Sequence, residues 1–304
     1  MDYSRLYNRL AGKISQGSVL RNEPMSKHTS FKIGGPADIL VMPGTLEEVK
    51  NALAIFREEE IEYFVMGNGS NLLVRDKGIR GVVIKIAEGY CKVNIEEDKI
   101  NAQAGVLLST LSKTIVEESL KGFEFASGIP GTLGGAVTMN AGAYGREMKD
   151  VIVGALVADR NGNVFNLNKD ELELDYRSSI IQKNGYVVLE VRIQLQKGDS
   201  DEIKGIIKDL TQRRTSKQPL HLPSAGSTFK RPPGHFAGKL IEDAGLKGVR
   251  LGGAKVSELH SGFIVNVDDA SAEDVINLIG LVQKTVRDKY EVELQPEVRI
   301  VGEV

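Results

Sequence analysis

The chain has 304 residues, of which 41% are hydrophobic and 26% are charged, and this length and composition are typical of a protein with two or three folded domains. Its formal net charge of −2 provides no overall attraction to nucleic acid or to an anionic membrane surface, so we expect neither as a partner. The single cysteine, Cys91, excludes an internal disulfide, and with only four dispersed histidines we predict no metal site.

Residues 1–88 predict a β-α-β unit that follows a short N-terminal helix and a polar linker. Thr45 and Glu48 have the spacing of a capping box, with Thr45 as the N-cap of an amphipathic helix that ends near Glu60. The strands expected around this helix are residues 39–42, 63–66, 72–74 and 82–86.

Residues 89–216 predict mixed helix and strand with mostly antiparallel pairing. Asn161-Gly162 is a strong signal for a two-residue hairpin turn, and the alternation of apolar and polar residues in 187–195 predicts a strand with one exposed face. The other expected elements are a hairpin of residues 93–95 and 100–102, helices at 106–119 and 201–214, and strands at 151–158 and 163–167.

Residues 217–304 predict a third unit, because residues 218–223 contain two prolines that end the preceding helix. We expect a helix at 236–244 with Gly245 in the C′ position, and a longer helix at 272–290 capped by Ser271. Strands are expected at residues 263–267 and 297–301. The three units together predict an α+β fold. No apolar run is long enough to cross a membrane and the N-terminus has no signal-peptide core, so we expect a cytoplasmic protein without membrane insertion.

Two glycine-rich loops are the strongest functional signals. Residues 66–72, MGNGSNL, follow a strand and offer consecutive backbone N–H groups, with Ser70 and Asn71 as further donors. This arrangement suits a pyrophosphate, although the third glycine of a dinucleotide fingerprint is absent. Residues 127–144, SGIPGTLGGAVTMNAGAY, include five glycines. Each loop alone could be a tight turn, but together they favour a large, flat, phosphate-bearing cofactor such as FAD.

The wording of these loops carries a family resemblance. IGGPADILVMP, GNGSNLLV and GIPGTLGGAVTMNAGAYG resemble the FAD-binding unit of vanillyl-alcohol-oxidase-type (PCMH) flavoproteins. Together with DYRSS, AGSTFKRP and LQPEVR, they resemble the UDP-N-acetylenolpyruvoylglucosamine reductase (MurB) family over residues 25–302. The resemblance implies a two-part FAD cradle, residues 1–88 and 89–216, and a substrate-binding domain, residues 217–304. No inserted tyrosine loop is present, so the chain resembles the shorter form of the family.

The resemblance also implies a reaction. NADPH would be the reductant and FAD would be held noncovalently, so His28 is expected to be structural. The enolpyruvyl group of UDP-N-acetylglucosamine-enolpyruvate would be reduced to a lactyl ether, giving UDP-N-acetylmuramate for peptidoglycan synthesis. Another oxidoreductase with the same cradle, such as a sugar or lactone oxidase, and a flavin-binding module without turnover are the alternatives. We expect a monomer or a weak oligomer whose partner is the UDP-sugar substrate.

Three residues are implied as catalytic. Arg177 would bind the substrate carboxylate with its planar guanidinium, and Glu297 would bind the acid that develops beside the reacting carbon. Ser227 would give the proton to that carbon. On the residues alone, a surface or structural ion pair is the better interpretation of Arg177, and a turn residue that of Ser227; the family resemblance reverses this for Arg177.

The remaining implied site residues fall into two sets. The FAD-binding set is Gly67, Asn68, Gly69, Ser70, Asn71, Ser127, Gly128, Ile129, Pro130, Gly131, Thr132, Gly134, Gly135, Asn140, Ala141 and Gly142. The substrate-binding set is Tyr176, Lys217, Lys230 and Arg231.

Overall fold

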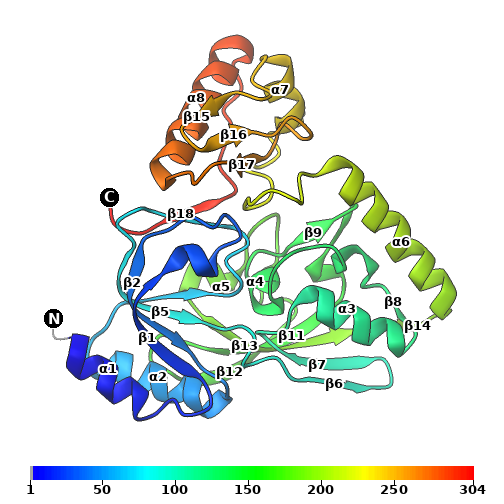
Figure 1. Cartoon of the computed structure of the whole chain (residues 1–304). Helices are drawn as coiled ribbons and strands as arrows, with labels where there is room; N and C mark the ends of the chain where they lie inside the picture. Colours follow the sequence, from blue (N-terminus) through cyan, green and yellow to red (C-terminus); the bar gives the residue numbers. More distant parts are fainter. Residues whose placement is uncertain (1–2) are drawn as a thin grey trace. The chain divides into compact units, whose positions relative to one another are not determined.

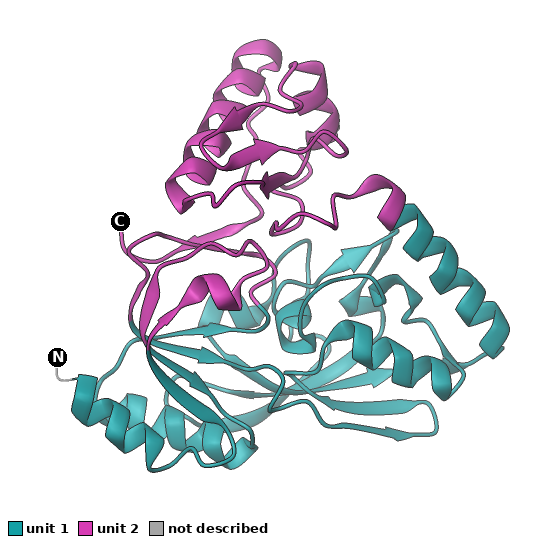
Figure 2. Cartoon of the chain, in the orientation of Figure 1, with its two compact units in different colours: residues 1–21, 39–68, 81–214 teal, residues 22–38, 69–80, 215–304 magenta. Residues whose placement is uncertain are grey.

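The computed structural model describes residues 3–304, and the chain divides into two compact units (Figures 1 and 2). Unit 1 comprises the residues up to 21 together with 39–68 and 81–214, and unit 2 comprises residues 22–38, 69–80 and 215–304. Each unit has its own hydrophobic core. The three-domain division remains a prediction, although the start of the C-terminal segment of unit 2 lies close to the predicted start of the third domain.

Unit 1 is built on an antiparallel sheet in the order β12-β11-β13-β7-β6, and helix α4 contacts this sheet at β13 and β7 (Figure 1). The turn that joins β11 and β12 lies where the Asn-Gly signal places it, but it is not the predicted two-residue turn. The Gly162 N–H donates to the Asp159 carbonyl at 3.1 Å, so Arg160 and Asn161 are the central residues, and Gly162 follows them with φ 83°. Its elements are α3 Leu108–Glu117, α4 Leu133–Thr138, α5 Ile180–Asn184, β6 Val93–Glu96, β7 Lys99–Gln103, β8 Leu120–Lys121, β9 Gly142–Ala143, β10 Arg146–Glu147, β11 Ile152–Ala158, β12 Val164–Asn168, β13 Val187–Gln194 and β14 Gln196–Lys197.

A second sheet has the order β1-β2-β5-β3, and the boundary between the units falls within β1, β2 and β5 in the sequence. β3 runs parallel to β5, with Tyr63 opposite Val82. The N-terminal helices α1 and α2 contact each other within unit 1. The bounds of these elements are α1 Tyr3–Ala11, β1 Ser18–Pro24, β2 Pro36–Met42, α2 Leu46–Glu58, β3 Tyr63–Met66 and β5 Ile79–Lys85.

Unit 2 contains a three-stranded antiparallel sheet, β15-β16-β17, with helix α8 lying against it (Figure 1). β4 and β18 pair in parallel, with Leu72 opposite Arg299. The Ser271 cap of α8 is confirmed as a full capping box, and Gly245 follows α7 with φ 79°. The bounds are β4 Leu72–Val74, α6 Ser200–Lys217 (which crosses the unit boundary), α7 Ala237–Asp243, β15 Arg250–Leu251, β16 Ala254–Val256, β17 Ile264–Asn266, α8 Ala272–Tyr290 and β18 Arg299–Val301.

The predicted capping box of α2 is only half correct. Thr45 is the N-cap and accepts the Glu48 N–H at 3.1 Å, but the Glu48 carboxylate accepts N–H bonds from Ser15 and Gln16 at 2.6 Å and from Gly44 at 2.8 Å. Burial would raise the pKa of Glu48, and these backbone donors outweigh it, so the pKa lies below its usual value. Glu48 therefore fastens the segment before β1 to the start of α2.

Three further predictions are corrected. Residues 18–24, expected as polar linker, form β1. The glycine-rich stretch, expected as a loop, contains the helix α4 with Thr132 as its N-cap. Glu297, expected to begin the last strand, precedes β18, which starts at Arg299.

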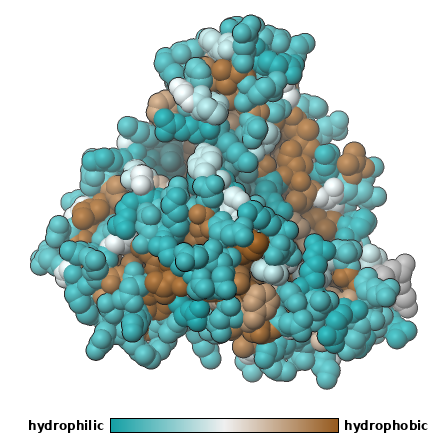
Figure 3. All heavy atoms as spheres, turned by 180° about the vertical axis from the view of Figure 1, so that it is seen from behind, coloured by the Kyte–Doolittle hydropathy of each residue, from teal (hydrophilic) through white to brown (hydrophobic). Residues whose placement is uncertain are grey.

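On the face shown in Figure 3, hydrophilic residues predominate and apolar residues form separate patches. Among residues 3–304, no helix is both long and apolar enough to cross a bilayer, and no group of three or more His, Cys, Asp and Glu side chains has the arrangement of a metal site.

Candidate active site

The two glycine-rich loops meet in unit 1. A Cβ atom added to Gly67, directly after β3, would lie 2.2 Å from the Thr132 Oγ1. Thr132 is 2% exposed and its Oγ1 accepts the Gly135 N–H at 3.4 Å, at the N-terminus of α4. Gly67 can approach this cap only because it has no side chain. Two loops that lie more than 60 residues apart in the sequence therefore form one surface, in which Gly67 lies against the Thr132 side chain.

The backbone of this surface fits a flavin cradle. Within residues 3–304, the N–H groups of Gly128, Gly131 and Thr132 donate to no protein acceptor, so they are available to oxygen atoms of a ligand. Gly131 has φ 135°, which favours glycine. Gly134 donates its N–H to the Ala104 carbonyl at 2.8 Å, and a Cβ atom at Gly134 would lie only 2.8 Å from the Ala104 Cβ.

The other predicted FAD-binding residues of unit 1 serve mainly to hold the loop. Ser127 donates its hydroxyl to the Glu124 carbonyl at 2.8 Å, and the Ile129 N–H bonds the Ala126 carbonyl. Gly142 lies in β9, where a Cβ atom would be 2.5 Å from the Arg146 carbonyl oxygen. Asn68, Pro130, Gly135 and Ala141 lie along the same segments.

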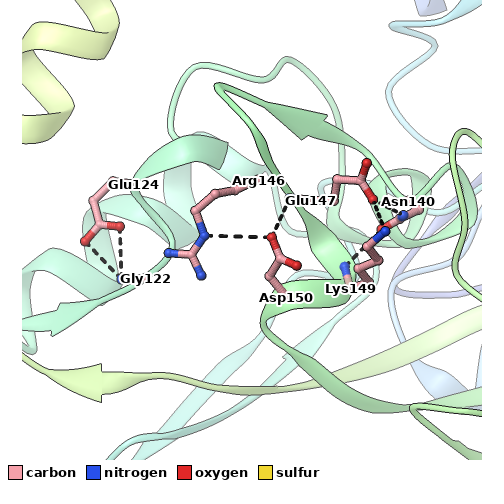
Figure 4. Close-up of polar contacts among 7 residues, drawn as sticks. All are labelled: Gly122, Glu124, Asn140, Arg146, Glu147, Lys149 and Asp150. Atoms are coloured by element: carbon pink, nitrogen blue, oxygen red, sulfur yellow. Dashed lines mark hydrogen bonds and ion pairs between the residues drawn. The ribbon is translucent and has the colours of Figure 1, made fainter.

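Asn140 is completely buried, with φ 43°. Its amide nitrogen donates to the Glu147 Oε2 at 2.8 Å and to the Asp175 carbonyl at 3.1 Å, and its Oδ1 accepts the Lys149 N–H at 2.9 Å. Figure 4 shows this cluster beside the capping box of Glu147 and Asp150. Both amide hydrogens are therefore used by protein acceptors, and a hydrogen bond donated by this side chain to a cofactor would require one of these bonds to break.

Arg177 lies at the tip of a tight turn in unit 1. Asp175 and Ser178 exchange two backbone hydrogen bonds of 3.1 and 3.0 Å, which leaves Tyr176 and Arg177 at the tip. Arg177 has φ 53°, and its guanidinium carbon lies 5.3 Å from the centre of the Tyr176 ring. Tyr176 is 46% exposed. The predicted carboxylate-binding and substrate-binding side chains are thus neighbours on one short turn.

Arg214 was not predicted and lies beside the glycine-rich stretch of residues 127–144. A Cβ atom at Gly128 would be 3.0 Å from the Arg214 Cδ and 3.6 Å from its Nη1. Burial lowers the pKa of Arg214, and no carboxylate in the described part of the chain pairs with it. A half-buried guanidinium without a carboxylate partner fits an anionic group of a ligand. The only sequence signal for it is its position three residues before the predicted Lys217.

In unit 2, the predicted loop residue Asn71 holds the backbone of Glu297. Its Nδ2 donates to the Glu297 carbonyl at 3.1 Å, and its own carbonyl accepts the Arg299 N–H at 3.0 Å. Gly69 has φ 65° and lies against the backbone of His28, where a Cβ atom would be 2.2 Å from the His28 carbonyl oxygen. The His28 ring Nε2 lies 3.2 Å from the Glu23 Oε1. Ser70 lies in the same loop between Gly69 and Asn71.

Ser227 and Glu297 lie on paired backbone segments of unit 2. The Glu297 N–H donates to the Thr228 carbonyl at 2.8 Å, and the Lys230 N–H donates to the Gln295 carbonyl at 2.8 Å. The ladder brings together segments about 70 residues apart in the sequence. Two of the three predicted catalytic residues thus share one framework within unit 2, whereas Arg177 belongs to unit 1.

His260, which was not predicted, lies close to Ser227. A Cβ atom at Gly262 would be 3.0 Å from the His260 Cε1 and 3.5 Å from the Ser227 Oγ. The His260 Nδ1 accepts the Gly262 N–H at 3.1 Å, so the neutral ring carries its proton on Nε2. Burial lowers the pKa of His260, which favours this neutral form. A single histidine outside any motif gave no sequence signal.

The predicted cations of the substrate domain are dispersed. The guanidinium carbon of Arg231 lies 4.0 Å from the centre of the Phe236 ring, and the Arg231 Nε donates to the His235 carbonyl at 3.3 Å. Phe236 is 61% exposed, so this cation–π pair is open to solvent. Lys217 is exposed at the end of α6, and Lys230 is half-buried beside Gln295.

Comparison with known proteins adds independent findings. Residues 37–168 match the model of an FAD binding domain, and residues 218–301 match that of the UDP-N-acetylenolpyruvoylglucosamine reductase C-terminal domain. The chain is 62% identical over 303 residues to the UDP-N-acetylenolpyruvoylglucosamine reductase of Alkaliphilus oremlandii and 52% identical over 303 residues to that of Clostridioides difficile, and both alignments cover 100% of each chain.

Solved structures show the same likeness to this family and, more widely, to this fold. The crystal structure of the reductase from Thermus caldophilus has a TM-score of 0.79 at 34% identity and covers 93% of this chain and 98% of its own. An alkyldihydroxyacetonephosphate synthase has a TM-score of 0.51 at 15% identity, covering 65% of this chain and 41% of its own. The latter is a likeness of fold alone.

Proposed function

Because this chain belongs to the UDP-N-acetylenolpyruvoylglucosamine reductase family, we propose that Arg177, Ser227 and Glu297 act on the enolpyruvyl group of its substrate. The protein is an FAD- and NADPH-dependent oxidoreductase that reduces UDP-N-acetylglucosamine-enolpyruvate to UDP-N-acetylmuramate for peptidoglycan synthesis. The full-length identity of 62% to a curated reductase carries this conclusion. The α+β fold and the FAD-binding prediction are confirmed by the same findings.

FAD would be held without a covalent bond by the backbone N–H groups of the loop that includes Gly131 and Thr132, and by the loop after β3. Bound there, FAD would supply hydride-transfer chemistry between NADPH and the vinyl carbon of the substrate. The backbone donors of Gly128, Gly131 and Thr132 support this proposal, because no protein acceptor among residues 3–304 competes with a ligand for them. Arg214 is a further candidate for an anionic group of FAD, NADPH or the sugar nucleotide.

The chemistry assigned to the three side chains follows from the charge that develops on the substrate. Arg177 would bind the enolpyruvyl carboxylate through two parallel N–H bonds and stabilise the negative charge that accumulates there. Glu297 would hydrogen-bond the same developing acid. Ser227 would donate its hydroxyl proton to the carbon next to the carboxylate, at the position that becomes the lactyl centre.

Substrate-binding roles remain proposals. Tyr176 lies beside Arg177 on the same turn, and Lys217, Lys230 and Arg231 supply positive charge for the UDP diphosphate. We propose that the protein works in the cytoplasm, where NADPH and sugar nucleotides are available, as a monomer or weak oligomer.

One experiment tests the function. The purified protein is reduced anaerobically with NADPH while the visible absorbance of the flavin is followed, and UDP-N-acetylglucosamine-enolpyruvate is then added. We expect bleaching by NADPH and recovery of the absorbance on adding the enolpyruvyl substrate. Rapid recovery with O₂ but none with the sugar nucleotide would indicate an oxidase, and a flavin that NADPH does not bleach would indicate a binding module. Either result would refute the proposal.

A further inference from the structure

We propose that Asn140 is a positioning residue for Arg177, and that it fixes the turn from which the Arg177 guanidinium reaches the substrate carboxylate. The inference rests on the proposed function, in which Arg177 binds that carboxylate. It gives a role to a buried side chain whose donors are already used by the protein.

The bond between Asn140 and Asp175 lies at the base of the Arg177 turn. The Asp175 carbonyl accepts the Ser178 N–H at 3.0 Å, which closes the turn, and it also accepts the Asn140 Nδ2 at 3.1 Å. One carbonyl thus closes the turn and anchors it to the buried amide. Because Arg177 is only two residues from this carbonyl and has a left-handed φ of 53°, a shift of Asp175 would move the guanidinium directly.

The surroundings of Asn140 require an amide at this position. Its second amide hydrogen bonds the Glu147 carboxylate at 2.8 Å, and its Oδ1 accepts the Lys149 N–H at 2.9 Å (Figure 4). Aspartate has nearly the same shape but would lose both donors and bring a second carboxylate beside Glu147. The φ of 43° is tolerated by asparagine and by glycine better than by most other residues.

A second tether supports the same turn. Ser179, which is completely buried, donates its hydroxyl to the Thr138 carbonyl at 2.7 Å, and the Gln182 Nε2 donates to the same carbonyl at 2.7 Å. Thr138 is the last residue of α4. Both sets of bonds therefore hold the Arg177 turn at the C-terminal end of α4, the short helix capped by Thr132, next to the proposed flavin loop.

The decisive variants are Asn140→Asp and Asn140→Gly, made in the full chain with FAD bound. Asn140→Asp keeps the shape and removes the donors, and Asn140→Gly removes the side chain and retains the left-handed backbone. Calorimetry on the oxidised protein gives the affinity for UDP-N-acetylmuramate, which carries a carboxylate, and for UDP-N-acetylglucosamine, which lacks it. We expect the affinity for UDP-N-acetylmuramate to fall on the order of tenfold, and the affinity for UDP-N-acetylglucosamine to remain unchanged.

Arg177→Lys provides the coupling test. If Asn140 acts by positioning the Arg177 guanidinium against the carboxylate, adding Asn140→Asp to Arg177→Lys causes little further loss of UDP-N-acetylmuramate affinity. Asn266→Asp is the matched control, because Asn266 is also a buried asparagine that donates to a backbone carbonyl, that of Phe31, and accepts the Ala270 N–H. It belongs to unit 2, and its effect on affinity should not depend on whether position 177 is arginine or lysine.

Three results would overturn the inference: equal losses for the two ligands, losses that add to that of Arg177→Lys, or unchanged affinity for UDP-N-acetylmuramate in both Asn140 variants. If Asn140→Asp does not fold, Asn140→Gly gives the same comparison. The wild-type protein separates this inference from the proposed function. If the wild type does not reduce the enolpyruvyl substrate, the function is wrong, whereas normal wild-type turnover together with any of the three results rejects only the role of Asn140.

Discussion

Replacing Gly67 by alanine tests whether the two glycine-rich loops form one cradle. The new methyl group would lie 2.2 Å from the Thr132 Oγ1, over an ångström inside ordinary van der Waals contact. Thr132 is buried at the cap of α4 and has little freedom to move away. Overpacking of this kind costs roughly 1–3 kcal/mol, so we expect Gly67→Ala to lower the free energy of unfolding by about 2 kcal/mol and to weaken flavin retention.

Removing the clashing atom should reverse most of this loss. Thr132→Ala alone deletes the N-cap and costs about 1 kcal/mol. In the double variant the nearest remaining Thr132 atom is the Cβ, 3.4 Å from the new methyl group, so the combined loss should be close to that of Thr132→Ala alone. Urea unfolding gives the free energies, and the visible absorbance of the purified protein gives flavin occupancy. Losses that simply add in the double variant would show that Gly67 and Thr132 do not pack against each other.

Other variants test separate parts of the account. Ser227→Ala should leave flavin reduction by NADPH nearly intact and block recovery of the flavin absorbance by the enolpyruvyl substrate, whereas a parallel loss of both in stopped-flow traces would make Ser227 structural. Gly134→Val should purify without flavin, because its Cβ would lie 2.8 Å from the Ala104 Cβ, and a fully yellow variant would contradict the cradle. Glu48→Gln should destabilise the protein by about 2 kcal/mol at neutral pH, because backbone donors lose a carboxylate acceptor. The pKa of Glu48 in the folded protein lies below the ordinary value of about 4.3. The wild type should therefore lose its stability advantage over Glu48→Gln as the pH falls through that folded pKa. A difference between the urea midpoints of the two proteins that stays constant with pH would refute the assignment.

Local patterns predicted the elements that depend on neighbouring residues. The Thr45 cap, the place of the turn at Asn161-Gly162 (though not its length) and the Ser271 cap follow from side chains and backbone only a few positions apart. Glu48 was misjudged because its strongest donors, Ser15 and Gln16, lie more than 30 residues earlier. A glutamate at this position can accept the N–H of its own helix cap or N–H groups of a loop far away in the sequence, and local spacing does not distinguish the two.

Helix α4 was missed because glycine and threonine have low helix propensity. The helix forms in a tertiary setting that demands small residues, since Gly134 contacts Ala104 and donates to its carbonyl. Arg214 and His260 were missed for another reason. A lone arginine or histidine has no pattern in one sequence, and its role becomes visible only through burial and neighbours such as Gly128 and Gly262.

Pairing of β4 with β18 sets the order in which unit 2 can be completed. Residues 72–74 find their partners only at residues 299–301, more than 220 positions later in the chain. During synthesis, β4 therefore lacks its β18 partner while residues 75–298 are made, and such unpaired edges favour pairing with other chains. The segment that holds Glu297 is thus finished among the last, and yield in the cell would depend on how well β4 is shielded until then.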